Sequence, residues 1–354
     1  MDFSPLKVAV IAPPWIPVPP PSYGGTESML DCLCRGLDAL GHDVLLIATG
    51  DSTCPVERFA PHERGLGTIR TTTVCEMAQA AAGYDRAIEW GADIVHDHTL
   101  AGPTLGAATS NIPVVTTNHG PFEGHLATVL RRVSRRVALI AISHAQASTA
   151  RDTQIAAVIH HGLDLRRYHF APDSGDYALF LGRMSRDKGV HIAIDVARAA
   201  GLPLKIAAKM AEPGEKAYFE RHVRPRLGPD AVFIGEAGPV EKARLLSGAR
   251  CLLNPIQWDE PFGLVAIEAL ASGTPVVTTP RGAMPELVDD GVTGFVRPNM
   301  EGLAHAVLNI DAIDREKCRR VAEERFSMER MTRDHVRLYH RIVQQQVEAS
   351  GRHG

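Results

Sequence analysis

The chain has 354 residues, of which 45% are apolar, so it exceeds the usual size of a single hydrophobic core and favours two domains. Its formal net charge of -3 provides no general attraction to nucleic acid or to acidic lipid headgroups, so an anionic ligand must be held by local groups. The six cysteines form neither a C-x-x-C pair nor a zinc-ligand pattern, which predicts reduced thiols in a cytosolic protein.

Residues 1–165 are predicted to form the first domain, in which short β-rich runs alternate with helix-length segments. The chain begins directly in such a run, with neither a signal-peptide core nor an apolar segment long enough to span a bilayer, so a cytoplasmic protein is expected. A helix is predicted over 26–41, with Thr26 as its N-cap. The predicted strands are KVAVIAPP, DVLLIAT, DIVHDH, PVVTTNHG and ALIAIS. This alternation indicates an α/β domain with a parallel sheet.

A turn-rich segment, VIHHGLDLRRYHFAPDSG, separates this domain from a second α/β domain predicted over 166–330. The strands predicted there are YALFLG, LKIAA, AVFIG, CLLNPI, PVVTT and GFV. The C-terminal segment, 331–354, is predicted to be an amphipathic helix and tail. We expect its apolar stripe to pack outside the second core, and a return to the first domain is the alternative.

Ligands of open parallel sheets bind beyond the carboxyl ends of the strands, and three loops at such positions have unusual sequences. The first loop, PPSYGGTE, has no side chains at Gly24 and Gly25, just before a predicted helix. Backbone N–H groups can therefore approach a phosphate closely there. An ordinary glycine turn is the alternative interpretation.

The second loop, GRMSRDKG, lies between a predicted strand and a predicted helix. Arg183 leaves the end of the strand and Lys188 lies at the start of the helix, so both cations can converge on one anion beside free helix N–H groups. A diphosphate fits that geometry. A solvated surface pair is the alternative.

The third loop is the turn QWDEP, which precedes the predicted helix FGLVAIEALASG. Phe262, Gly263 and Leu264 would supply the unsatisfied N–H groups of its first turn. Glu268 lies further along this apolar helix, where the vicinal hydroxyls of a ribose could donate to both of its oxygens. Glu260, in the turn, would face the other end of the same ligand. A paired structural glutamate is the alternative for Glu268.

Together these loops resemble a known family. The Glu260-x7-Glu268 spacing, the Arg183 and Lys188 pair, the glycine loop and the closing RGAMPELVDDGVTGFV are similar to retaining glycosyltransferases of family four, with the GT-B fold. The resemblance covers almost the whole chain and is strongest over 177–296. It implies two facing Rossmann-like domains, with a nucleotide sugar held mainly by the second and an acceptor by the first.

The resemblance also implies roles for individual residues. Glu268 would bind the donor ribose, while Glu260 and the backbone of residues 262–264 would hold the transferred sugar and phosphate. Arg183 and Lys188 would neutralise the leaving diphosphate. His119, in TTNHGPFEG, matches a position that lines the transferred sugar, and a structural loop histidine is its alternative.

The implied reaction is transfer of a hexose from a nucleoside diphosphate sugar to an unidentified sugar, lipid or small-molecule hydroxyl. A UDP sugar is the first choice of donor, with GDP and ADP sugars as alternatives. The chain has KIAAKM where many relatives have a glycine pair, which weakens the prediction of the donor. The family generally needs no metal or other cofactor, because Arg and Lys take the place of the metal. A non-catalytic sugar-nucleotide-binding module and a GT-B epimerase or phosphorylase are the alternatives.

Two further segments invite a functional interpretation. In the triplet HDH only His96 and His98 share a strand face, so a metal site is not favoured there. LATVLRRVSRRV, residues 126–137, is predicted to be a helix with an apolar stripe surrounded by arginines. Some family members use such a helix to reach anionic membranes, which leaves peripheral contact with the inner membrane face open beside the interpretation as a solvated face.

Overall fold

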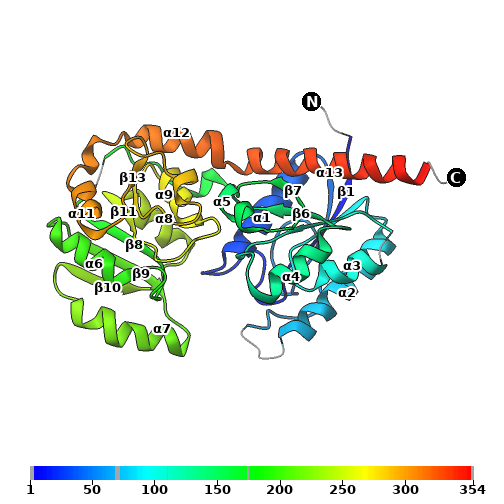
Figure 1. The fold of residues 1–354 in the computed structure, drawn as a ribbon, viewed down its shortest axis with the longest axis horizontal. Helices are drawn as coiled ribbons and strands as arrows, with labels where there is room; N and C mark the ends of the chain where they lie inside the picture. The colour runs from blue at the N-terminus through cyan, green and yellow to red at the C-terminus, as the bar shows by residue number, and fades with distance from the viewer. Residues whose placement is uncertain (1–3, 68–71, 110, 174, 352–354) are drawn as a thin grey trace. The chain divides into compact units, whose positions relative to one another are not determined.

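The computed structural model of the protein describes residues 4–67, 72–109, 111–173 and 175–351. It divides into two compact units, each with a parallel sheet and covering helices (Figure 1). Unit 1 comprises Met1–Gly162 with Met328–Gly354, and unit 2 comprises Leu163–Ser327. The boundaries that the sequence predicted, after residue 165 and at residue 331, therefore lie a few residues beyond the observed divisions.

Among the described residues, unit 1 contains a seven-stranded sheet with the order β3-β2-β1-β4-β5-β6-β7, in which all pairs are parallel. The strands are β1 (Lys7–Ile11), β2 (Asp43–Ile47), β3 (Glu57–Phe59), β4 (Ile94–Asp97), β5 (Val114–Thr117), β6 (Ala138–Ala141) and β7 (Ile155–Val158). Every residue of β4 and β5 is buried. Burial on both faces explains why these strands are apolar runs rather than alternating patterns.

The helices of unit 1 are α1 (Gly25–Ala39), α2 (Thr72–Trp90), α3 (Gly102–Thr109), α4 (Gly124–Val133), α5 (His144–Thr149) and α13 (Met328–Gly351). They enclose two main apolar clusters. One contains alternate residues of β1 together with α1 and α13, and the other contains the remaining residues of β1 together with α2. Successive side chains of a strand point to opposite faces of the sheet, so the same strands contribute residues to both apolar clusters.

The C-terminal helix α13 packs on the core of unit 1. Its residues Met331, Val336, Leu338 and Tyr339 are buried in the cluster that contains α1. Gly36 permits the close approach, because a Cβ atom at that position would lie 2.1 Å from Oγ1 of Thr332. The expectation that this helix packs outside the second core is wrong, and the alternative, a return to the first domain, is confirmed.

Unit 2 contains, within the described residues, a six-stranded parallel sheet with the order β10-β9-β8-β11-β12-β13. The strands are β8 (Ala178–Arg183), β9 (Leu204–Lys209), β10 (Ala231–Gly235), β11 (Cys251–Asn254), β12 (Val276–Thr278) and β13 (Gly294–Val296). The α-helices are α6 (Val190–Ala199), α7 (Pro213–Tyr218), α8 (Pro239–Ser247), α9 (Leu264–Ala271), α10 (Met284–Leu287), α11 (Met300–Leu308) and α12 (Arg315–Phe326). Short 3₁₀ or π turns lie at η1 (Leu165–Arg167), η2 (Phe219–Val223), η3 (Arg224–Arg226) and η4 (Ile310–Ala312).

Two arginines of α12 tie the first residues of unit 2 to its core. The buried guanidinium of Arg315 donates hydrogen bonds to the carbonyl oxygens of Ala171, Ser247 and Ala249, at 2.8 to 2.9 Å. Nη1 of Arg319 donates to the carbonyl oxygens of Tyr168, at 3.1 Å, and Ala271, at 2.6 Å. The segment that the sequence indicated only as turn-rich is therefore fixed against α12.

Several local predictions differ from the structure. Strands β3 and β7 were not predicted. Helix α4 ends at Val133 with Ser134 as its C-cap, so the predicted helix over 126–137 is too long. Helix α1 has Gly24 rather than Thr26 as its N-cap, and Thr26 lies inside the first turn. The six cysteines are free, as predicted.

Candidate functional site

Unit 2 brings together the residues that the sequence singled out in the second and third loops. Arg183 is the last residue of β8, and Lys188 and Gly189 precede α6. Gly189 has a φ of 74°, and a Cβ atom there would lie 2.1 Å from the carbonyl oxygen of Pro255. Glycine therefore allows the loop after β8 to lie directly against the loop after β11.

The two cations of the β8 loop have separate carboxylate partners. Nη2 of Arg183 lies 3.2 Å from Oδ2 of Asp187. Nζ of Lys188 donates a short hydrogen bond to Oε2 of Glu260, which also accepts from Nε1 of Trp258 at 2.9 Å. The Lys188 and Glu260 side chains are only 15% and 14% exposed, so this ion pair is shielded yet still open to a ligand.

A glycine supports the turn that carries Glu260. Gly282, in the loop after β12, has a φ of 54°, and a Cβ atom there would lie 2.2 Å from the Glu260 carbonyl oxygen. That oxygen accepts a 2.9 Å hydrogen bond from the N–H of Ala283, and the N–H of Gly282 donates to Oδ1 of Asp259 at 3.3 Å. The RGAM segment thus fixes the position of the EPFGL turn.

Helix α9 begins at Leu264, with Gly263 as its N-cap at a φ of 102° and without a side-chain capping bond. Within this first turn the N–H of Ala266 donates to the Gly263 carbonyl oxygen at 3.0 Å, and the backbone dipoles give this end of the helix a partial positive charge. Phe262 is 3% exposed and its ring packs against that of Phe326, so its side chain belongs to the core of unit 2.

Glu268 is 7% exposed within α9, and its carboxylate has protein partners. Its Oε1 accepts hydrogen bonds from Nζ of Lys242, at 2.5 Å, and from the hydroxyl of Tyr168, at 2.9 Å. Sequence reasoning expected ribose hydroxyls at both oxygens, with a paired structural glutamate as the alternative; the pairing of Oε1 agrees with that alternative, and neither partner was identified. They lie 26 and 100 positions away, and no local pattern connects them to α9.

Gly24, Gly25 and His119 belong to unit 1. Gly24 could not carry a side chain without displacement, since a Cβ atom there would lie 2.7 Å from Cβ of Pro20 and 2.9 Å from Oε2 of Glu27. Burial raises the pKa of Glu27 to about 7. The negative charge beside the glycine loop is therefore reduced at neutral pH, which favours an anion at the start of α1.

His119 lies in a group of buried histidines in unit 1. Its Nε2 lies 3.0 Å from Nδ1 of His98, and its ring stacks on His161 with centroids 5.4 Å apart. Burial, followed by the nearby His335, lowers the pKa of His119 to about 4. A neutral imidazole at neutral pH can exchange hydrogen bonds with sugar hydroxyls but offers no charge to a phosphate.

The side chain of His96, the other histidine of the HDH triplet, forms hydrogen bonds with other side chains of unit 1. Nδ1 of His96 lies 2.6 Å from the hydroxyl of Tyr339, and its Nε2 lies 2.8 Å from Oγ1 of Thr117. The ring of His96 also lies 3.9 Å from that of His98, centroid to centroid. Across the described part of the chain, no three His, Cys, Asp or Glu side chains are grouped so that they could hold a metal ion.

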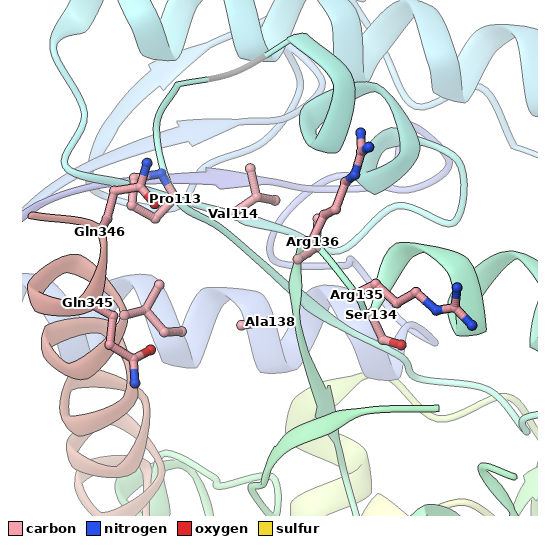
Figure 2. Close-up of a pocket in the computed structure, with 10 residues that line it drawn as sticks. Pro113, Val114, Ser134, Arg135, Arg136, Ala138, Gln345 and Gln346 are labelled. Carbon is pink, nitrogen blue, oxygen red and sulfur yellow. The ribbon is translucent and has the colours of Figure 1, made fainter. Parts of the chain in front are cut away.

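The arginine-rich segment borders a cavity of about 280 Å³ in unit 1, beside the starts of β5 and β6. Figure 2 shows Gln345 and Gln346 on one side and Arg135 and Arg136 on the other, with the two guanidinium groups pointing away from each other. Both arginines follow the end of α4. Among the described residues, no helix combines the length and apolar character that a membrane-spanning segment requires.

Comparison with known proteins places these features in a family. The model described as "Glycosyltransferase Family 4" matches residues 23–167, and the model described as "Glycosyl transferases group 1" matches residues 175–311. The first match includes the glycine loop and His119. The second includes both cations of the β8 loop, the EPFGL turn and Glu268.

Relatives and solved structures agree with these matches. A glycogen synthase of Mycobacterium tuberculosis is 29% identical over 87% of this chain and 88% of its own length. A GDP-mannose-dependent alpha-mannosyltransferase of Corynebacterium glutamicum is 26% identical over 82% of this chain and 76% of its own length. The crystal structure of AviGT4, a glycosyltransferase involved in avilamycin A biosynthesis, superposes with a TM-score of 0.75 at 27% identity, covering 96% of this chain and 99% of that one.

Proposed function

This chain belongs to glycosyltransferase family 4 and has the GT-B fold, and from that premise we propose that it is a retaining hexosyltransferase. It is a glycosyltransferase that uses a sugar-nucleotide donor. We propose a UDP sugar as the first candidate donor, with GDP and ADP sugars next. The proposed acceptor is a hydroxyl group of a sugar, a lipid or a small molecule.

The observation that carries this proposal is the arrangement at the carboxyl ends of β8 and β11. Lys188, bonded to Glu260, lies beside a turn that leads directly into the uncapped start of α9. A cation and free helix N–H groups are suited to a diphosphate. The carboxylate of Glu260 and the backbone of residues 262–264 are suited to the sugar hydroxyls and phosphate oxygens at the other end of the donor.

In the proposed reaction the bond between the sugar C1 and the diphosphate oxygen breaks, and a bond forms from C1 to the acceptor oxygen on the same face. The acceptor proton passes to the departing phosphate oxygen. Arg183 and Lys188 stabilise the negative charge that grows on the leaving group, so no step is assigned to a metal ion or other cofactor. Glu268 holds the donor ribose, and His119 lines the transferred sugar.

The first test is a thermal-shift series with UDP, GDP, ADP and their glucose and mannose derivatives. A ligand at 100 times its dissociation constant should add about 2.7 kcal/mol to the free energy of unfolding. Transfer to a panel of hydroxyl acceptors, followed by NMR of the product anomer, then tests retention. An inverted anomer would refute the retaining mechanism, and binding without turnover by any acceptor would favour a non-catalytic module.

A further inference from the structure

Glu268 has one occupied carboxylate oxygen and one that lacks a protein partner. Oε1 accepts hydrogen bonds from both Lys242 and Tyr168, at 2.5 and 2.9 Å. Oε2 has no hydrogen-bond partner among the described residues. Because the side chain is 7% exposed, an unpaired oxygen in this position is costly unless a ligand or solvent reaches it.

Lys242 is held in place by its own helix. It lies in the first turns of α8, and its N–H donates to the carbonyl oxygen of Gly238 at 2.8 Å. Helix α8 packs against α9, which carries Glu268. The Lys242 side chain is 24% exposed, so its ammonium is partly withdrawn from water where it meets the carboxylate. Such a charge-assisted bond is stronger and better oriented than one on an open surface.

Tyr168 approaches the same oxygen from a different element. Its carbonyl oxygen accepts from Nη1 of Arg319, and the same nitrogen donates to Ala271 at the end of α9. The backbone of Tyr168 is therefore fixed relative to the helix that carries Glu268. Tyr168 lies near the start of unit 2 and Lys242 near the middle of its sequence, and each is anchored independently of the other.

We propose that Lys242, assisted by Tyr168, is a positioning residue that turns the Glu268 carboxylate so that Oε2 faces the ribose of the donor. This inference rests on the proposed function, in which Glu268 binds ribose. With Oε1 occupied, Oε2 of the ionised carboxylate is left as an acceptor, and a ribose hydroxyl can donate to it. Lys242 thereby sets the preference of the site for ribose over 2′-deoxyribose.

The test is isothermal titration calorimetry with UDP and 2′-deoxy-UDP, repeated with GDP and 2′-deoxy-GDP. The unmodified protein is expected to bind the ribonucleotide about 10- to 100-fold more tightly than the deoxyribonucleotide, the range for one hydrogen bond to a charged group. In Lys242→Met, the affinity for the ribonucleotide should fall about 10-fold while the affinity for the deoxyribonucleotide changes little. The ratio of the ribonucleotide affinity to the deoxyribonucleotide affinity should therefore decrease. Lys242→Arg, which keeps the charge, should restore part of the ratio.

Two further variants separate positioning from support of the fold. Tyr168→Phe removes only the weaker donor and should contract the ratio less than Lys242→Met does. Lys216→Met removes an exposed lysine of α7 that does not contact Glu268, and it should leave the ratio unchanged. If Lys242→Met fails to fold, Lys242→Arg and Tyr168→Phe still decide the question, since both are required to contract the ratio in part.

The outcomes distinguish this inference from the proposed function. If Lys242→Met lowers the affinities for the ribonucleotide and the deoxyribonucleotide equally, or leaves the ratio of the two affinities unchanged, the positioning role is refuted. A protein that transfers sugar but has no ribose preference would also refute it while leaving glycosyl transfer intact. Failure of the unmodified protein to bind any of UDP, GDP and ADP, the last taken from the thermal-shift series, would overturn the proposed function and this inference together.

Discussion

Lys188 and Glu260 form a shielded ion pair in the candidate site. A substitution of Lys188 therefore removes a partner of Glu260 as well as a positive charge. In the proposed reaction the Lys188 ammonium stabilises the leaving group, and it also neutralises Glu260. The same contact orients Glu260, whose oxygen Trp258 also binds. We therefore expect Lys188 to stabilise the transition state, in which negative charge develops on the leaving group, more than it stabilises the bound donor.

Lys188→Ala should therefore lower kcat on the order of 10²- to 10³-fold, with a smaller change in donor affinity. Lys188→Arg should restore only part of the activity, because a planar fork does not fit the position of a compact ammonium. Steady-state kinetics and direct binding measure both effects, with Lys216→Ala as the matched lysine control. A Lys188→Ala enzyme with normal kcat would remove this residue from the mechanism.

The buried histidines of unit 1 predict acid sensitivity. Burial lowers the pKa of His119 and of His335 to about 4, below the ordinary value of 6.5. Both groups are neutral in the folded protein and bind protons more readily when unfolded. Their contribution to stability is therefore present above pH 6.5 and is lost as the pH falls toward 4.

Calorimetric melting temperatures measured across this pH window should fall on acidification more steeply for the unmodified protein than for His335→Gln. His335 accounts for part of the proton uptake, and its Nδ1 lies 2.9 Å from the Met331 carbonyl oxygen of its own helix. Identical pH profiles for the two proteins would show that His335 titrates normally in the folded state.

At the residue scale, the sequence predicted that Glu268 needs a polar partner but not which one. The apolar neighbours in α9 indicate burial directly. Lys242 and Tyr168 are brought to it by the packing of separate elements, and such contacts leave no local signature. The pairing of Arg183 with Asp187 is local, since they lie four positions apart, but spacing shows which charges can meet and not which ones do.

At the level of elements, the close contact between α1 and α13 depends on one missing side chain. A Cβ atom on Gly36 would lie 2.1 Å from Oγ1 of Thr332, and that hydroxyl is itself bonded to the Met328 carbonyl oxygen. The threonine therefore has little freedom to move aside. Alanine would otherwise be the better residue in the middle of a helix.

Gly36→Ala should destabilise the protein by about 1 to 3 kcal/mol, the usual cost of overpacking. Chemical denaturation measures the change. Thr332→Ala removes the clashing hydroxyl, so Gly36→Ala should be much less harmful in that background, and the double-mutant cycle isolates the contact. Additive effects of the two substitutions would contradict the proposed clash.

Elements with strong apolar runs were predictable, and the exceptions have physical reasons. Strand β3 is a short edge strand with the sequence ERF. Its charged residues interrupt the apolar pattern by which a strand is predicted from sequence. Strand β7, with the sequence IAAV, has only four residues and ends at Val158, where the turn-rich segment begins. The apolar stripe of α13 correctly indicated burial, but a stripe carries no information about which core it meets.

At the scale of the whole molecule, the arginine-rich segment is a poor membrane anchor. Leu126, Leu130, Val133 and Val137 pack into the apolar clusters of unit 1, and Val129, 37% exposed, is too little apolar surface for insertion into a bilayer. The net charge of -3 adds no attraction. Electrostatic contact through the exposed arginines alone is screened within about 8 Å at physiological salt.

The protein should therefore remain in the supernatant when centrifuged with anionic phosphatidylglycerol vesicles at physiological ionic strength. The double substitution Arg132→Glu with Arg135→Glu should behave identically. Pelleting of the unmodified protein that this double substitution abolishes would establish a membrane-binding role for the segment.

The return of α13 to unit 1 has a consequence for the order in which the chain can fold as it leaves the ribosome. Unit 2 is continuous in sequence, whereas the core of unit 1 requires residues from both sides of it. Domains generally fold as they emerge, the N-terminal one first, but here unit 2 has all its residues before unit 1 does. Until Met331 to Tyr339 are synthesised, the apolar face of α1 is left without the helix that covers it. Premature termination within α13 would thus yield a complete unit 2 attached to an incomplete unit 1, a product suited to recognition by chaperones and proteases rather than to catalysis.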